Sequence, residues 1–184
     1  MDDSKIIELF FERSEQAITE LSEKYGAVCM KTARNILGSK SDAEECVNDT
    51  YLAVWNTVPP QKPNPLLTYL CKIVRNISLK KYHSNTAQKR NTVYDAALDE
   101  IEDYIPSPSN VEDELNAKLL SQQIADFLYT LDKDNRVMFV RRYWYSDSVS
   151  DIAAAFGTSA HNVSARLHRI RKELKNYLTS KGEI

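Results

Sequence analysis

Apolar residues recur every three or four positions over most of this chain, which is the period of an amphipathic helix. The pattern predicts a first helix from about residue 3 to 25 and a second from 27 to 37, each followed by a glycine that can end a helix. Ser41 is expected to cap the next helix, because Glu44 lies three positions later and completes a capping box. The inner face of that helix would carry Val47, Thr50, Tyr51 and Val54.

Prolines separate this helix from the next one. The segment from Pro59 to Pro65 cannot lie inside a helix, because proline lacks the backbone donor and clashes with the preceding turn. A long helix is predicted from Leu66 to about His83. Periodicity then fades between residues 84 and 110, which indicates an extended, acidic linker. Helical spacing resumes near residue 111, with a predicted core of Leu115, Leu119, Ile124, Phe127 and Leu128, and continues in a helix over 133–145.

The stretch from Ser148 to Leu174 has the order of parts of a helix-turn-helix. Gly157 can supply the left-handed turn, and Ser159 is a suitable N-cap for the second helix. An ordinary helical hairpin needs the same spacing, so this stretch alone leaves both interpretations open. The residues expected to pack inward from the two helices are Ile152, Ala153, Phe156, Val163, Leu167 and Ile170.

Composition supports an all-α protein, because the 184 residues include only 4 glycines and few alternating β-branched runs. We predict two small helical domains, residues 1–90 and 113–184, joined by an acidic linker over 91–112. The 3 cysteines share no metal-type spacing and are expected to be buried, reduced thiols. No targeting segment and no apolar run long enough to span a bilayer is present, so we expect a cytoplasmic protein without membrane insertion.

Charge is segregated along the chain although the formal net charge is only −2. Acids dominate residues 1–49, none occurs from 50 to 94, and eight acids without a base fill 95–114. Residues 152–181 are basic again. Each block could be a solvated face, but two basic blocks separated by an acidic one favour nucleic acid as a partner.

No catalytic constellation is found. The chain lacks a phosphate-binding glycine loop, a nucleophile elbow and a zinc-protease motif, so we predict no enzyme activity, no cofactor and no metal site. His161 and His168 lie two turns apart on one helix face, where surface groups near DNA are favoured over metal ligands.

The basic helix after the prolines has a composition suited to unpaired DNA. Its cations can neutralise phosphates, while its aromatic and amide groups can stack on and hydrogen-bond to bases. The stiff proline loop could hold one flipped base at low entropic cost. Trp55, just before the loop, is more readily explained as a core residue.

Four stretches resemble a known family. Residues 42–55, Asp-Ala-Glu-Glu-Cys-Val-Asn-Asp-Thr-Tyr-Leu-Ala-Val-Trp, resemble the region-two helix of small sigma factors, and residues 67–76 look like the next helix, with its hydrophobic-x-x-Ile-x-Arg-Asn type of ending. Residues 136–143 and 152–171 look like region four. In this order, around an acidic linker, they are similar to the extracytoplasmic-function (ECF) group of sigma-70-type RNA polymerase sigma factors, which keep only these two domains.

The resemblance implies roles for particular residues. A first set would contact bacterial core RNA polymerase: Asp42, Glu44, Glu45, Asn48 and Asp49. A second would hold the unpaired strand of the promoter's minus-ten element: Lys62, Asn64, Tyr69, Lys72, Arg75, Asn76 and Lys80. A third would bind the minus-thirty-five element, with His161, Asn162, Ala165 and Arg166 at base edges and Arg169, Arg171 and Lys172 at phosphates. Ser159 belongs to the same set.

The resemblance also implies a possible anti-sigma partner and promoter-specific initiation without catalysis by the chain itself. Two departures concern specificity. Positions 161–163 read His-Asn-Val where the family often has Gly-Thr-Val, and the loop is unusually rich in proline. The alternative function is a stand-alone helix-turn-helix regulator whose first domain senses a ligand or binds another protein.

Overall fold

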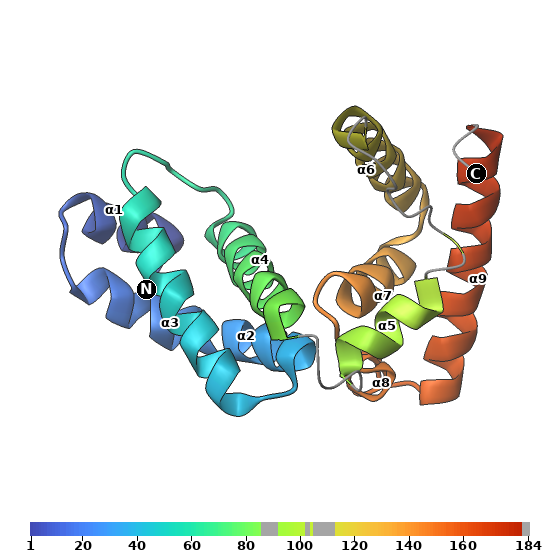
Figure 1. The fold of residues 1–184 in the computed structure, drawn as a ribbon, viewed down its shortest axis with the longest axis horizontal. Coiled ribbons are helices and arrows are strands. Elements are labelled where there is room, and N and C mark those ends of the chain that lie inside the picture. Colours follow the sequence, from blue (N-terminus) through green and yellow to red (C-terminus); the bar gives the residue numbers. More distant parts are fainter. Residues whose placement is uncertain (86–91, 102–103, 105–112, 182–184) are drawn as a thin grey trace. The chain divides into compact units, whose positions relative to one another are not determined.

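The computed structural model describes residues 1–85, 92–101, 104 and 113–181, with the side chains of 113–118 excepted. All the elements within these residues are α-helices (Figure 1). They form two compact units, residues 1–94 and 95–184, and the boundary falls inside one helix. The all-α prediction is confirmed.

The first unit packs four helices around one core. They are α1 (Asp3–Phe11), α2 (Gln16–Leu37), α3 (Lys40–Thr57) and α4 (Leu66–Asn85). The longest three, α2, α3 and α4, pack against one another, and α1 packs on α2. Buried apolar side chains line the contacts, including Phe10, Leu21, Val54, Leu70 and Val74.

The first helix boundary differs from its prediction. The break comes at residues 12–15, where Arg13 takes a positive φ of 55°, and α2 then continues through Gly26. Gly26 serves packing, since a Cβ atom there would lie 3.0 Å from the Tyr51 hydroxyl. The periodic pattern could not separate a helix-ending glycine from one that allows close approach.

The N-terminus of α3 also differs by two residues. Ser39 caps the helix, and its hydroxyl accepts a hydrogen bond from the Asp42 amide at 3.3 Å. Ser41 is already helical, so the predicted capping box with Glu44 does not form. The buried inner face of Val47, Thr50, Tyr51 and Val54 is confirmed, as is the burial of the three cysteines.

The second unit is built from α6 (Asp113–Thr130), α7 (Lys133–Tyr143), α8 (Val149–Phe156) and α9 (Ala160–Ser180). Two groups of buried side chains hold it together. One joins Phe127 and Phe139 to the far half of α9, and the other joins Met138 to α8 and the near half of α9. Among the predicted core residues, Phe127 is buried, whereas Leu119 is 52% exposed.

The segment predicted as an extended linker contains a helix, α5 (Val93–Ile101). Its periodicity was obscured by its shortness and by its three acids at 95, 99 and 100, which are typical of a charged tether. Ile101 packs on the core of the second unit, and the side chain of Ala97 is also buried. Residues 102–103 and 105–112 of the same predicted linker lie outside the described residues.

Candidate nucleic-acid interface

The helix-turn-helix geometry is confirmed in α8 and α9. The Ser148 hydroxyl caps α8 through the Asp151 amide at 3.0 Å, and the Ser159 hydroxyl caps α9 through the Asn162 amide at 3.1 Å. Gly157 ends α8 with a φ of 61°. A Cβ atom at Gly157 would meet no neighbour within 4 Å, so the glycine is needed for its left-handed backbone conformation.

One face of α9 is exposed, and its opposite face is buried in the second unit. Val163, Leu167 and Ile170 are buried as predicted. The exposed side is polar and basic and has no acid until position 173. Its exposed residues include His161, Asn162, Ala165, His168, Arg169 and Lys172.

Asn162 is also held in place at the start of α9. Its side-chain amide donates to the Thr158 hydroxyl at 2.8 Å, while its backbone amide is bound by Ser159. The first turn of α9 is therefore fixed by two side chains of the preceding turn. Such preorganisation lowers the conformational entropy lost when the helix binds a duplex.

Two predicted contact residues on α9 have partners within the unit. Arg166 donates to the Asn135 side chain at 2.8 Å and lies 4.0 Å from the Asp132 carboxylate, both at the start of α7. Arg171 has a side chain that is only 12% exposed and pairs with Glu100. Arg171 thus lies away from the exposed face, because the Glu100 carboxylate holds it.

In α4, three predicted residues form an exposed stripe. Lys72, Asn76 and Lys80 are spaced four residues apart, so they lie along one side of the helix, and all three are exposed. Leu66, Leu70 and Val74 are buried on another side. The stripe therefore presents two cations and one amide to solvent.

The other predicted minus-ten residues are placed differently. The Tyr69 hydroxyl donates to Thr57 at 2.8 Å, and the Arg75 guanidinium lies 5.8 Å from the centre of the Tyr94 ring. Burial lowers the pKa of Arg75. In the proline loop, Lys62 lies 5.0 Å from the centre of the Phe11 ring and Asn64 is exposed.

The acids of α3 are largely paired with lysines. Lys81 of α4 forms ion pairs with Glu45 and, at 3.7 Å, with Asp42. The hydrogen bond to Glu45 raises the pKa of Lys81. Glu44 lies 3.6 Å from Lys40, one helical turn away. Asn48 and Asp49 are exposed on the same helix.

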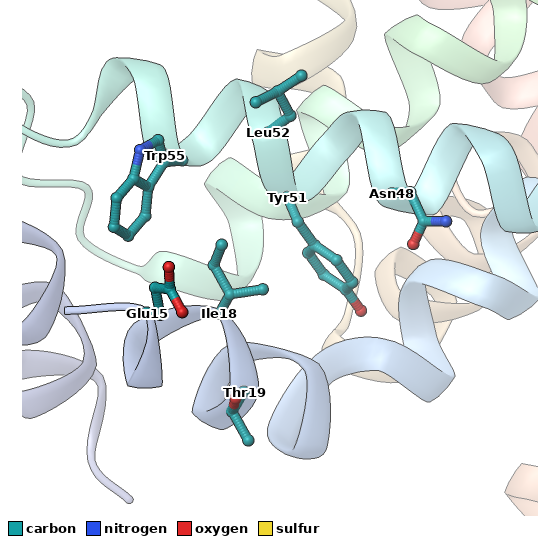
Figure 2. A pocket seen from close by; sticks show the side chains of 7 residues that line it. All are labelled: Glu15, Ile18, Thr19, Asn48, Tyr51, Leu52 and Trp55. Carbon is teal, nitrogen blue, oxygen red and sulfur yellow. The ribbon is translucent and has the colours of Figure 1, made fainter. Parts of the chain in front are cut away.

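An open groove of about 620 Å³ lies between α2 and α3 (Figure 2). Tyr51 and Trp55 project from α3 toward the start of α2, and Leu52 projects away from it. Leu52 is 58% exposed although it is apolar. The full lining is Glu15, Ile18, Thr19, Asn48, Tyr51, Leu52 and Trp55.

Trp55 is only half-buried, in partial agreement with its predicted core role. Its ring packs edge-on against Phe10 at 6.1 Å between centroids. Arg13 also contacts it, with a guanidinium 5.5 Å from the ring centre and a 2.6 Å hydrogen bond to the Trp55 carbonyl.

This groove is not among the sites predicted from the sequence. The sequence does contain a sign of it, because Asn48, Leu52 and Trp55 recur at helical spacing outside the buried stripe of α3. A leucine on that side does not pack in the core and therefore indicates a binding surface.

Within the residues that the structure describes, no cluster of His, Cys, Asp or Glu could hold a metal ion. In the same residues, no helix is both long and apolar enough to cross a membrane. Burial raises the pKa of the Cys29 thiol to about 12, so this cysteine is a poor nucleophile.

Comparison with known families decides the assignment. Residues 21–88 match the model for sigma-70 region 2, and residues 121–174 match the model for sigma-70 region 4. The chain belongs to the sigma-70 family of RNA polymerase sigma factors. Region 2 therefore corresponds to the α2–α4 bundle, and region 4 to the unit that carries the helix-turn-helix. The segment that contains α5 is matched by neither model.

Individual relatives place the chain in the ECF group. It is 28% identical to the ECF RNA polymerase sigma factor SigL of Mycobacterium tuberculosis, over 88% of this chain and 89% of SigL. It is also 28% identical to the RNA polymerase sigma factor NccH of Alcaligenes xylosoxydans xylosoxydans, over 98% of each chain. The solved structure of CnrH in complex with the cytosolic domain of CnrY covers 97% of both chains at 21% identity, with a TM-score of 0.46.

The family defines the overall function. This ECF sigma factor directs promoter-specific transcription initiation by RNA polymerase, and it belongs to a family that is not enzymatic. The sequence-based identification and function are confirmed. The residue-level roles remain predictions.

Proposed function

We propose that the exposed face of α9 reads the minus-thirty-five element of the promoter as duplex DNA. The observation that carries this proposal is the polar, basic side of α9, which begins at a doubly capped first turn. His161 and Asn162 offer donors and acceptors where a major groove presents base edges. Arg169 and Lys172, farther along the same face, can neutralise phosphates. Ala165 between them leaves room for the groove wall or a thymine methyl group.

The α4 stripe of Lys72, Asn76 and Lys80 holds the unpaired minus-ten strand in this proposal. Single strands are bound by cations that follow the backbone together with polar or aromatic groups at the bases. Arg75 and Tyr69 line the same helix, but their side chains already have protein partners. They therefore contribute by supporting the stripe or by exchanging partners when DNA binds.

Core RNA polymerase docks on the α2–α3 groove in this proposal. An exposed leucine beside a half-buried tryptophan is the kind of apolar centre that dominates protein–protein binding energy, with polar Asn48 and Glu15 at its margin. Asp49 can add a polar contact. Asp42 and Glu45 act indirectly, because their ion pairs with Lys81 fix α3 against α4.

We also propose an anti-sigma partner, following the family resemblance. The relative CnrH, 25% identical over 92% of this chain, has been solved in complex with the cytosolic domain of CnrY. A cytoplasmic location follows from the proposed work with RNA polymerase.

Reconstituted transcription tests the proposed roles. The full chain is mixed with bacterial core polymerase and a promoter library randomised at both elements, and the transcript starts are sequenced. We expect starts downstream of two enriched elements. Replacing His161 and Asn162 should change only the upstream element, whereas replacing Lys72 and Asn76 should impair promoter opening. If the chain binds specific duplex DNA without polymerase and does not direct core polymerase to specific starts, it is a stand-alone regulator.

A further inference from the structure

A carboxylate is bound by two largely buried arginines in the second unit, at the end of α7 and the middle of α9. It belongs to Glu100, from the helix α5 that neither family model covers. Arg142 binds both carboxylate oxygens, with Nη2 at 2.7 Å and Nε at 3.2 Å. Arg171 Nη1 lies 3.1 Å from Glu100 Oε2, and the Tyr143 hydroxyl donates to the same oxygen at 3.0 Å.

The arginines of the site are largely buried, and the carboxylate is partly exposed. The side chains of Arg142 and Arg171 are 4% and 12% exposed, and that of Glu100 is 29% exposed. Burial raises the pKa of Tyr143, which therefore keeps its proton and can donate. A bidentate contact between a carboxylate and a buried arginine is strong, and removal of the carboxylate leaves two largely buried cations without a counter-charge.

Three parts of the helix-turn-helix unit converge on Glu100. Arg171 belongs to α9, Tyr143 ends α7, and Arg142 also donates through Nη1 to the Asp147 carbonyl at 3.0 Å, just before α8 begins. Arg171 Nη1 further donates to the Tyr143 hydroxyl at 2.6 Å. One carboxylate thereby links α7, the α7–α8 connection and α9.

A second residue from the same intervening segment reaches α9. The Tyr104 ring centre lies 5.6 Å from the Arg171 guanidinium and 5.7 Å from the Lys175 ammonium group. Arg171 is thus contacted on α9 by both a carboxylate and an aromatic ring of this segment. The exposed positions Arg169 and Lys172 lie two residues before and one residue after Arg171.

We propose that Glu100 is a positioning residue for promoter recognition: by binding Arg142 and Arg171 it fixes the rotation of α9 and hence the direction of its DNA-facing side chains. Part of the segment predicted as a linker is then a component of the promoter-reading unit. The proposal rests on the proposed reading of the minus-thirty-five element by α9. The buried arginines favour a permanent contact over one that is released in the holoenzyme, because release would strand both charges.

The matched pair of variants is E100Q and D99N. Both remove one negative charge from α5, but Asp99 is exposed, whereas Glu100 is in the buried site. Hydrogen exchange of the α9 amides is measured first in the free, full-length chain. We expect E100Q to speed exchange around Arg171 about tenfold or more, and D99N to leave it unchanged, since breaking a buried ion pair costs far more than losing a surface charge.

The functional arm uses holoenzyme reconstituted with core polymerase. The probes are a duplex selected by the wild-type holoenzyme from a library randomised at the minus-thirty-five position, and its scrambled counterpart. We expect E100Q to lower the preference for the selected duplex about tenfold, E100D to restore part of it, and E100Q to add little in an R171Q background.

Equal behaviour of E100Q and D99N in both arms would overturn the proposal. Faster exchange in E100Q with an unchanged duplex preference would also overturn it, because Glu100 would then only stabilise the fold. Tighter promoter binding by E100Q would overturn it too, because Glu100 would then inhibit DNA binding. If E100Q does not fold, E100D and R171K carry the same comparison. The proposed reading by α9 would be refuted if the wild-type chain selected no duplex, or if replacing His161 and Asn162 did not change the selection. The hydrogen-exchange measurement would still test the Glu100 contact in that case.

Discussion

The helices α4 and α9 are both basic and both assigned to DNA, yet they present their charges differently. In α9, the inward arginines Arg166 and Arg171 are fixed by internal acids or amides, and the exposed side begins at a rigid, doubly capped turn. In α4, the exposed set is a narrow stripe, while Tyr69 and Arg75 have partners in the bundle. A rigid polar face suits a regular duplex groove, and a narrow stripe suits a flexible single strand.

The two units also use their acids differently. In the first, Lys81 draws Asp42 and Glu45 into partly exposed pairs that join α3 to α4. In the second, Glu100 pairs with two largely buried arginines. Exposed pairs contribute little to stability, whereas loss of one partner of a buried pair is costly. Removing one partner of these ion pairs is therefore expected to destabilise the second unit more than the first.

The largest expected effect tests whether the two units fold separately. Leu167→Ala removes a fully buried side chain between α8 and α9 and should destabilise the second unit by about 2–5 kcal/mol. Hydrogen exchange should rise in α8 and α9 and stay unchanged in α2–α4. Leu119→Ala, at a position 52% exposed, is the matched control and should change little. Equal loss of protection in both units would contradict separate folding.

The next effect sharpens the role of α9. Replacing His161 and Asn162 by alanine should cost about 1–3 kcal/mol of discrimination for each lost base contact, without altering the downstream element. Selection from a library randomised at both elements measures it. Asn176→Ala, on the exposed side near the far end of α9, is the control and should keep the wild-type preference.

The groove gives a smaller effect on polymerase binding. Leu52→Ala should weaken binding to core polymerase about tenfold, as expected for a central apolar contact, and leave stability nearly unchanged because the side chain is 58% exposed. Val28→Ala, another exposed apolar change but outside the groove, serves as the control. Unchanged affinity of the Leu52 variant in a direct binding assay would remove the groove from the polymerase interface.

The smallest effect concerns the α4 stripe. Replacing Lys72 and Lys80 by alanine should weaken binding to a single-stranded minus-ten oligonucleotide severalfold, and should reduce its salt dependence by about 1.4 in log–log slope if each lysine contacts one phosphate. Lys81→Ala is the control, since Lys81 is paired with acids of α3. If the salt dependence changes only for Lys81→Ala, the DNA contact lies on the side of α4 that carries Lys81, and the proposed stripe is wrong.

The sequence predicts the helical fold and the helix-turn-helix well because both depend on local periodicity and on capping residues such as Ser159 and Gly157. It misplaces the first helix break because a glycine at a close helix contact looks like a helix end. It also leaves out α5 and the role of Glu100, because a carboxylate among acids in a polar segment gives no sign of its distant arginine partners. Arg171 was assigned to phosphate contact for the same reason, since sequence shows charge but not direction.

The most direct test of the account is to add the purified chain to bacterial core polymerase on genomic DNA and sequence the 5′ ends of the transcripts. The account predicts defined starts that share two upstream elements, of which only the farther one changes when His161 and Asn162 are replaced. Starts no more specific than those of core polymerase alone would contradict it.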